Sequence, residues 1–250
     1  MIKGLYTGAA GMLAAQTQSE IIADNVANIR TPGYKAEESS NKAFPELLMM
    51  RTSTENEIPG NTVIGGMGTG VVVDQVTRMN VQGALQTTDL TTDLALTSEA
   101  LFVVETPNGE RYTRNGQFQL NAEGMLQTAD GNPVLGEEGP IGPLSRDFSV
   151  DTNGAIYDGG VLVDQLRLVQ IPNEELIREG QSLYTSNQAV QAWQGEPGIR
   201  QGFLEGSNVD LTGQMVKMIT VMRAYEANQK VIQTQDSTLD KAVNEIGRIV

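Results

Sequence analysis

Residues 211–250 carry the pattern that most constrains the fold, two apolar rows in which every seventh residue repeats. The first row contains Leu211, Met218, Tyr225, Ile232, Leu239 and Ile246. The second row contains Met215, Met222, Gln229, Asp236, Val243 and Val250. A repeat of about 3.5 residues is typical of a helix that winds around another helix. The pattern therefore predicts a long C-terminal helix that needs a partner. Its polar positions either fix helix register from inside the seam or, at Asp236, face solvent after a shift in phase.

The N-terminal segment is the expected partner, because apolar residues recur there three or four positions apart. Its stripe contains Leu5, Met12, Ile22, Val26 and Ile29. Glycine and alanine crowd the first half of the segment, so another helix could approach closely, although each glycine lowers helix stability by about 1 kcal/mol relative to alanine. We expect the helix to stop at residues 30–33, where Thr31 precedes Pro32 and Gly33 permits a tight turn.

Between these ends, the apolar period changes to two and turn pairs such as Asn108-Gly109 and Glu123-Gly124 recur. Short apolar runs between tight turns predict antiparallel strands. We therefore expect an α+β fold, in which N- and C-terminal helices form a coiled-coil domain and a Gly-rich antiparallel β domain is inserted between them. The expected divisions are an N-terminal helix at 1–35, a linker with a short helix and a flexible loop at 36–75, a β domain at 76–203 and a C-terminal helix at 204–250.

Composition narrows the range of functions. The net charge of −14 disfavours nucleic acid and anionic lipid as partners, since phosphate binding needs clustered Lys and Arg. Residues 1–38 and 204–250 are each near neutral, so the charge lies in the middle of the chain. The chain has no cysteine and no histidine, which removes the usual metal ligands and the usual general base, and we expect no cofactor. No transmembrane segment is expected, and the uncharged run at 4–19 is a poor signal peptide that we expect to stay uncleaved.

Three local patterns resemble catalytic or binding motifs but have simpler explanations. The carboxylate pairs Glu137-Glu138 and Glu174-Glu175 could serve a glycosidase, yet neither has aromatic residues nearby to stack a sugar. The Gly-rich run at 66–70 is followed by a strand-like segment, where a nucleotide site needs a helix. Residues 151–154 begin like a calcium loop but lack the later ligands. We therefore expect no enzyme, while a glycan-cleaving enzyme remains an alternative.

Several stretches resemble one protein family. Residues 24–35 (DNVANIRTPGYK) are similar to the N-terminal signature of bacterial flagellar rod and hook proteins, and residues 204–210 (LEGSNVD) with 222–228 (MRAYEAN) are similar to the C-terminal one. Residues 82–86 and 112–118 (YTRNGQF) add matches in family order. The size resembles the proximal or distal rod subunits, whereas hook proteins are usually longer. The motif residues are Asn25, Asn28, Pro32, Gly33, Tyr34, Glu205, Gly206, Ser207, Asn208, Arg223, Tyr225 and Asn228.

This resemblance implies a structural subunit of the flagellar basal-body rod, which stacks helically through its terminal helices into a hollow shaft that transmits torque to the hook. The implied partners are copies of the chain, neighbouring rod and hook subunits, and the flagellar export apparatus, which would deliver it to the basal body without a cleaved signal peptide. The alternatives are a hook or rod-cap relative, or an acidic extracellular adhesin with a helical stalk.

Overall fold

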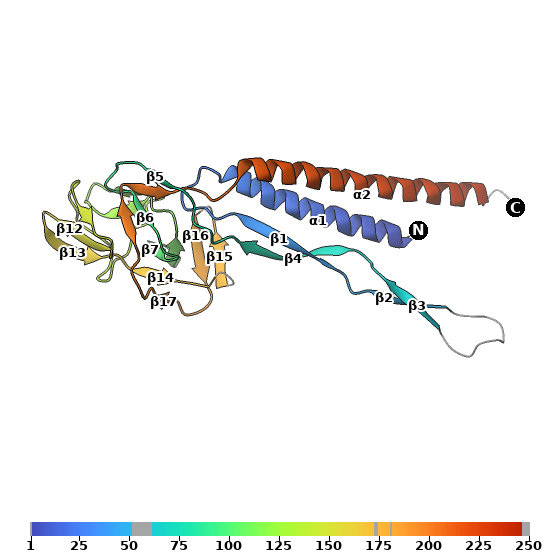
Figure 1. Cartoon of the computed structure of the whole chain (residues 1–250), viewed down its shortest axis with the longest axis horizontal. Helices are drawn as coiled ribbons and strands as arrows, with labels where there is room; N and C mark the ends of the chain where they lie inside the picture. Colours follow the sequence, from blue (N-terminus) through green and yellow to red (C-terminus); the bar gives the residue numbers. More distant parts are fainter. Residues whose placement is uncertain (1, 52–61, 173–174, 181, 247–250) are drawn as a thin grey trace. The chain divides into compact units, whose positions relative to one another are not determined.

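The structure is a computed structural model that describes residues 2–51, 62–172, 175–180 and 182–246. The chain divides into two compact units. Unit 1 contains Met1–Asp24, Glu37–Thr77 and Leu211–Val250, and unit 2 contains Asn25–Ala36 and Arg78–Asp210. Helices at both ends and antiparallel strands between them confirm the α+β class (Figure 1).

Unit 1 is built around two helices, α1 (Ile2–Ala27, with its last residues in unit 2) and α2 (Leu211–Ile246). The predicted C-terminal helix is thus present from Leu211 to the end of the described residues. The helices run antiparallel and in contact, because glycines at the start of α1 face positions near the end of α2 and Ser19 meets Met218 (Figure 1).

Unit 1 also contains a two-stranded ribbon. Strand β1 (Glu37–Ala43) pairs with β4 (Val71–Arg78), and β2 (Leu47–Arg51) pairs antiparallel with β3 (Thr62–Met67). Sequence analysis expected a linker with a short helix and a flexible loop at 36–75, where the structure has these four strands instead. Residues 52–61, within the expected loop, lie outside the described residues. The ribbon forms through pairing with a distant segment, which local periodicity does not reveal.

Unit 2 is an assembly of short antiparallel strands. Its largest sheet has six strands in the order β15-β16-β8-β7-β14-β17, and a three-stranded sheet has the order β11-β12-β13. The remaining pairs are β9 with β10, β6 with β18, and β5 with β19. The strands are β5 (Leu85–Thr87), β6 (Leu94–Leu96), β7 (Leu101–Thr106), β8 (Gly109–Thr113), β9 (Phe118–Leu120), β10 (Leu126–Thr128), β11 (Ser149–Val150), β12 (Ala155–Asp158), β13 (Val161–Gln165), β14 (Leu168–Gln170), β15 (Leu176–Glu179), β16 (Leu183–Ser186), β17 (Gln191–Ala192), β18 (Ile199–Gln201) and β19 (Phe203–Glu205).

The predicted turn pairs occupy the turns between these strands. Asn108-Gly109 joins β7 to β8, and Glu123-Gly124 joins β9 to β10. Gly109 and Gly124 have φ values of 103° and 81°, which side-chain-bearing residues rarely adopt. The turn residues therefore set the lengths of these strands.

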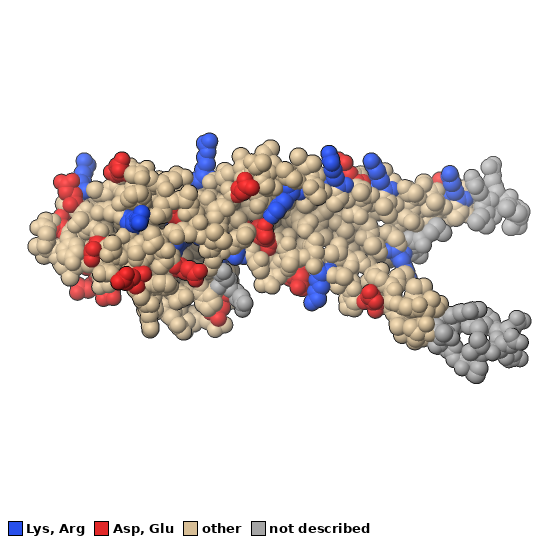
Figure 2. Space-filling view, viewed as in Figure 1, with Lys and Arg blue, Asp and Glu red and all other residues tan. Residues whose placement is uncertain are grey.

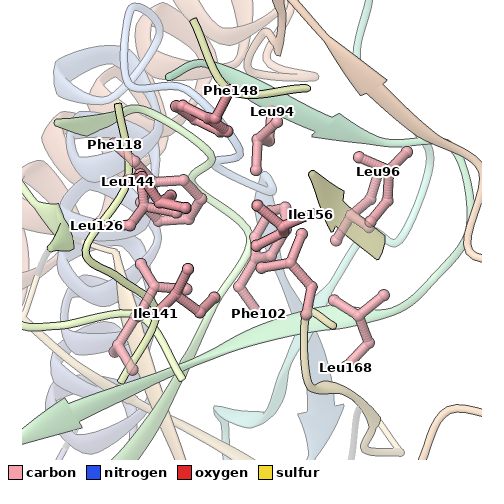
Figure 3. Close-up of a cluster of buried hydrophobic side chains, with 14 of the residues drawn as sticks. Leu94, Leu96, Phe102, Phe118, Leu126, Ile141, Leu144, Phe148, Ile156 and Leu168 are labelled. Carbon is pink, nitrogen blue, oxygen red and sulfur yellow. The ribbon is translucent and has the colours of Figure 1, made fainter. Parts of the chain in front are cut away.

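The core of unit 2 is made of large apolar side chains from many strands (Figure 3). Phe102 and Phe118 pack edge to face, with ring centroids 5.1 Å apart. Every buried member of this cluster, which we call the β core, lies between Leu94 and Ile199. The half-buried Trp193, the only tryptophan of the chain, packs against it. The β core thus needs neither terminal helix to be complete.

Candidate functional site

The face that α1 turns toward α2 is made of small residues. A Cβ placed on Gly8 would lie 3.0 Å from the Ile232 side chain, and one on Gly11 would lie 2.7 Å from the Asn228 amide. Gly4 faces Gln235 in the same way. Positions 4, 8 and 11 have heptad spacing, so glycines line the close contact between the helices. The helices therefore approach closely, but the contact buries few large apolar side chains.

The two predicted rows of α2 have different surroundings. In the first row, Met218, Ile232 and Leu239 are half-buried, whereas Leu211 and Tyr225 are exposed. In the second row, Met215 and Met222 are 55% and 53% exposed, and Gln229, Asp236 and Val243 are exposed too. The side chain of Ile246 and all of Val250 lie outside the described residues. Only the first row thus turns partly toward α1 within one chain.

The predicted N-terminal stripe is divided between the two units. Leu5 and Met12 are half-buried and Ile22 is buried, all in unit 1. Val26 and Ile29 belong to unit 2, where Ile29 packs beside Tyr34, Ala36 and Val209. The residues of the stripe are therefore shared between unit 1 and unit 2.

Large apolar side chains remain uncovered in unit 1. On α2 they are Leu211, Met215, Val216, Ile219, Met222, Tyr225, Val231 and Val243, and on α1 they are Tyr6 and Leu13. The strands β2 and β3 add Leu47, Leu48, Met49, Met50, Val63 and Ile64. Charged side chains stand apart along α2, with uncharged surface between them (Figure 2). Exposed apolar side chains that recur along one element in this way are typical of protein–protein contact.

Nine of the twelve motif residues come together in unit 2. Arg223, Tyr225 and Asn228 instead lie on α2 in unit 1. The N-terminal and C-terminal motifs meet where the Gly33 N–H donates to the Glu205 backbone carbonyl at 2.7 Å. Gly33 has a φ of 70°, and a Cβ there would lie 2.5 Å from the Arg114 backbone, so only glycine fits. The family signatures at the two ends therefore form one structural cluster.

An ion triad lies at the centre of this cluster. Glu205 is 2% exposed and accepts from Lys35 Nζ at 2.5 Å and from Arg114 Nε at 2.6 Å. Its Oε1 also accepts from the Gly83 N–H at 3.0 Å. Arg114 donates to the backbone carbonyls of Leu96 and Ala100 as well. One buried carboxylate thus serves two buried cations.

Sequence analysis named Glu205 as a site residue but omitted Lys35 and Arg114. Both stood within the quoted motifs, at 24–35 and 112–118. The signal available in the sequence was a basic residue within each of these glycine-containing motifs, Lys35 in one and Arg114 in the other. Their partnership depends on bringing three distant segments together, which motif spacing does not show.

Asn208 ties several segments of unit 2 together. Its Oδ1 accepts from the Ala36 N–H at 2.7 Å, and its Nδ2 donates to the carbonyls of Met79 and Val81 at 2.8 and 3.0 Å. Nearby, the Tyr34 hydroxyl lies 3.1 Å from Asn25 Oδ1, to which it donates. These contacts fix the N-terminal motif against the residues that precede α2.

Burial and the neighbouring charges shift the pKa values of Glu205 and Lys35 in opposite directions. Burial alone would raise the pKa of Glu205, but the charges of Arg114 and Lys35 and their hydrogen bonds together hold its pKa below the ordinary value. Burial lowers the pKa of Lys35, and Glu205 offsets only part of that effect. The carboxylate form of Glu205 is therefore the form that fits this site.

The other carboxylates that sequence analysis considered are not gathered into a comparable site. Glu137 and Glu138 are exposed and line a surface hollow with Glu105, Glu110 and Arg167. Glu174 lies outside the described residues, and Glu175 is half-buried just before β15. Within the part of the chain that the structure describes, no group of three or more acidic side chains is placed to hold a metal ion. Over the same residues, neither helix has a stretch long and apolar enough to cross a membrane.

Comparisons with known proteins match the chain in three places. The family model for flagella basal body rod protein matches residues 5–35, the model for the flagellar hook protein FlgE/F/G D1 domain matches 95–174, and the model for the flagellar basal body rod FlgEFG protein C-terminal matches 200–245. The chain is 37% identical to the flagellar hook-basal body complex protein FlhO of Bacillus subtilis, over 100% of both chains. The chain belongs to the family of flagellar basal-body rod proteins.

Other relatives agree with this family. The rod protein is 32% identical to the flagellar basal-body rod protein FlgG of Bacillus subtilis, over 98% of this chain and 99% of the relative. It is 34% identical to the flagellar basal-body rod protein FlgF of Caulobacter vibrioides, over 100% of both chains. The rod protein is therefore a structural component of the flagellar basal body and not an enzyme, as its sequence predicted.

Proposed function

We propose that the terminal helices of the rod protein form a coiled coil and bind the terminal helices of neighbouring copies. Repetition of this contact would build a helical, hollow shaft that transmits motor torque to the hook. The observation that carries the proposal is the exposed apolar surface of α2, which includes the second row at Met215 and Met222.

The distribution of side-chain sizes supports this assignment. Glycines on α1 line the contact within the chain, whereas large apolar residues lie on surface that the chain itself does not cover. Full burial of one large apolar side chain contributes about 1.5–3 kcal/mol of favourable free energy, which is absent while the side chain stays in water. Neighbouring copies would recover this free energy on assembly.

The ribbon formed by β2 and β3 offers a second contact. Leu48 and Ile64 are among its most exposed apolar residues. An apolar two-stranded ribbon is marginal in water by itself. We include the ribbon in the contacts with neighbouring rod or hook subunits.

The route to the basal body follows from the same proposal. The flagellar export apparatus would deliver the chain with its N-terminus uncleaved, since α1 continues as one helix through residues 4–19. A subunit at the hook or the rod cap is the alternative within the family. No observation favours an adhesin.

A single charge in the second row tests the proposal. We expect Met222→Asp, in a strain lacking the native gene, to abolish hooks and filaments in electron micrographs of whole cells. Burying an unpaired carboxylate between copies would cost several kcal/mol. Ser237→Asp puts the same charge at an exposed polar position of α2 and should restore flagella. The proposal is wrong if Met222→Asp assembles normally.

A further inference from the structure

We propose that Glu205 is an ionic latch that docks the segment Asn25–Ala36 onto the rest of unit 2, and that releasing the latch frees this docking segment while the β core stays folded. The inference concerns one chain in solution and does not rest on the proposed function. Docking would then require the C-terminal part of the chain. The Glu205 carboxylate that binds Lys35 lies after Ile199, the last buried residue of the β core.

The docking segment shares little apolar surface with the β core. Its buried apolar residues, Tyr34 and Ala36, form a separate cluster with Val209, and Ile29 packs against it. None of these residues belongs to the β core, whose buried members end at Ile199. The segment and the core can therefore separate without opening the core.

Three polar contacts of the docking segment are made to residues shortly before α2, while the Ala36 carbonyl accepts from the Met79 N–H at 2.8 Å. Gly33 donates to the Glu205 carbonyl, Lys35 to the Glu205 carboxylate and Ala36 to Asn208 Oδ1. Lys35 Nζ also donates to the Val81 carbonyl at 2.9 Å. A chain that lacks residues 205–208 would therefore lose the main partners of the segment together.

The contacts of the triad determine which part of unit 2 is released when the Glu205 charge is lost. Without the carboxylate, Lys35 and Arg114 would be two buried cations that lack their shared counter-ion, which is unfavourable. Arg114 keeps its carbonyl partners, Leu96 and Ala100, at the β core. Lys35 lines a surface pocket with Glu99 but is fully hydrated only when the docking segment leaves. Loss of the Glu205 charge therefore releases the segment and not the core.

The Glu99 carboxylate does not replace that of Glu205 as a counter-ion for Lys35. It acts on Lys35 only through a weak charge interaction, and its side chain is exposed. Water screens such a charge, so it compensates a buried cation poorly. The carboxylate of Glu205 is the only one that bonds Lys35 and Arg114 among the described ion pairs.

Limited trypsin digestion of the full chain tests the latch, with cleavage after Lys35 measured by mass spectrometry. Lys35 is buried in the docked state, so the wild type should resist at this bond. We expect Glu205→Gln, which keeps the shape and removes the charge, to be cleaved there on the order of 100-fold faster. The urea midpoint followed by Trp193 fluorescence should stay unchanged. The matched control is Glu110→Gln, which removes a carboxylate that bonds Arg167 at the surface and should cleave like the wild type.

A second variant separates charge from shape. In the Glu205→Gln background, Lys35→Met removes the buried cation and should restore slow hydrogen exchange at the Gly33 and Ala36 amides. Equal cleavage of Glu205→Gln and wild type after Lys35 would overturn the proposal. So would loss of the Trp193 transition in Glu205→Gln, because the core would then depend on the latch, and so would failure of Lys35→Met to restore protection.

Discussion

The helix pair of unit 1 and the β core of unit 2 use apolar residues in opposite ways. The β core encloses its large side chains, such as Phe102 and Phe148, almost completely. The helix pair places glycine at its inner contact and leaves Met215, Met222 and similar residues outside. One region buries its apolar surface within the chain, and the other leaves much of it exposed, where we propose that partners cover it. The comparison teaches that apolar content alone does not reveal which surface belongs to the fold and which to the assembly.

Hydrogen exchange of the isolated chain should show the largest difference between the two regions. Because α2 gains little burial from α1, we expect its middle amides to exchange on the order of 1,000-fold faster than those of β7, an inner strand of the six-stranded sheet. Exchange mass spectrometry at protein concentrations low enough to keep the chain monomeric measures this ratio. Equal protection of α2 and β7 in a verified monomer would contradict the distinction between the helix pair and the β core.

Truncating a core side chain should destabilise unit 2 strongly. Phe102→Ala removes a fully buried ring and should lower the free energy of unfolding of unit 2 by about 3–5 kcal/mol. Urea unfolding followed by Trp193 fluorescence measures the change. Val161→Ala, at an exposed position of β13, is the control and should change it by about 0.5 kcal/mol or less. A small effect of Phe102→Ala would show that the core tolerates the cavity.

Glycine to alanine changes should have opposite results in the two regions. A Cβ on Gly116 would lie 1.6 Å from the Leu94 carbonyl oxygen, so Gly116→Ala should cost unit 2 about 2 kcal/mol or more. A Cβ on Gly8 would lie 3.0 Å from the Ile232 side chain and 3.7 Å from the Asn228 backbone oxygen, a milder contact that alanine offsets by favouring the helix by about 1 kcal/mol. Gly8→Ala should therefore leave helicity unchanged or higher by circular dichroism. A loss of helicity would mean that the close contact already stabilises the isolated pair.

Acid should weaken docking of the segment Asn25–Ala36, and this is the smallest effect we predict. Because the pKa of Glu205 is depressed in the folded state, its contribution to stability is present above the ordinary carboxyl pKa and is lost as pH falls through the folded value. Protection of the Gly33 amide, corrected for intrinsic exchange, should fall from pH 7 to pH 3 in the wild type. Glu205→Gln should lose this dependence, and an unchanged slope would assign it to another group.

Much of the fold could be predicted from local pattern. The heptads of 211–250 predicted α2, and the Asn-Gly and Glu-Gly pairs predicted tight turns, because both depend on residues close in sequence. Strands β2 and β3 were missed because each is ordered by its pairing with the other. The residues of the motif cluster were named from the resemblance, but the triad of Lys35, Arg114 and Glu205 is formed by tertiary contacts alone.

The helix faces show a second limit of sequence patterns. Heptad spacing identified two rows on α2 but could not say which row meets α1. In the structure the glycines of α1 at positions 4, 8 and 11 meet Gln235, Ile232 and Asn228 of α2, and only Ile232 belongs to a predicted row. Sequence analysis indicated that the small residues permit close approach, but the periodicity did not show which residues of α2 they would meet.

The most direct test of the account is the accessibility of the second row in assembled flagella. Since the chain contains no cysteine, Met222→Cys introduces a single thiol for maleimide labelling. Val104→Cys, at a fully buried position of the β core where cysteine is similar in size to valine, is the control that should label slowly in every state. The account predicts that the thiol at position 222 labels rapidly in the purified chain and is protected in isolated basal bodies. Equally rapid labelling in both states would contradict it.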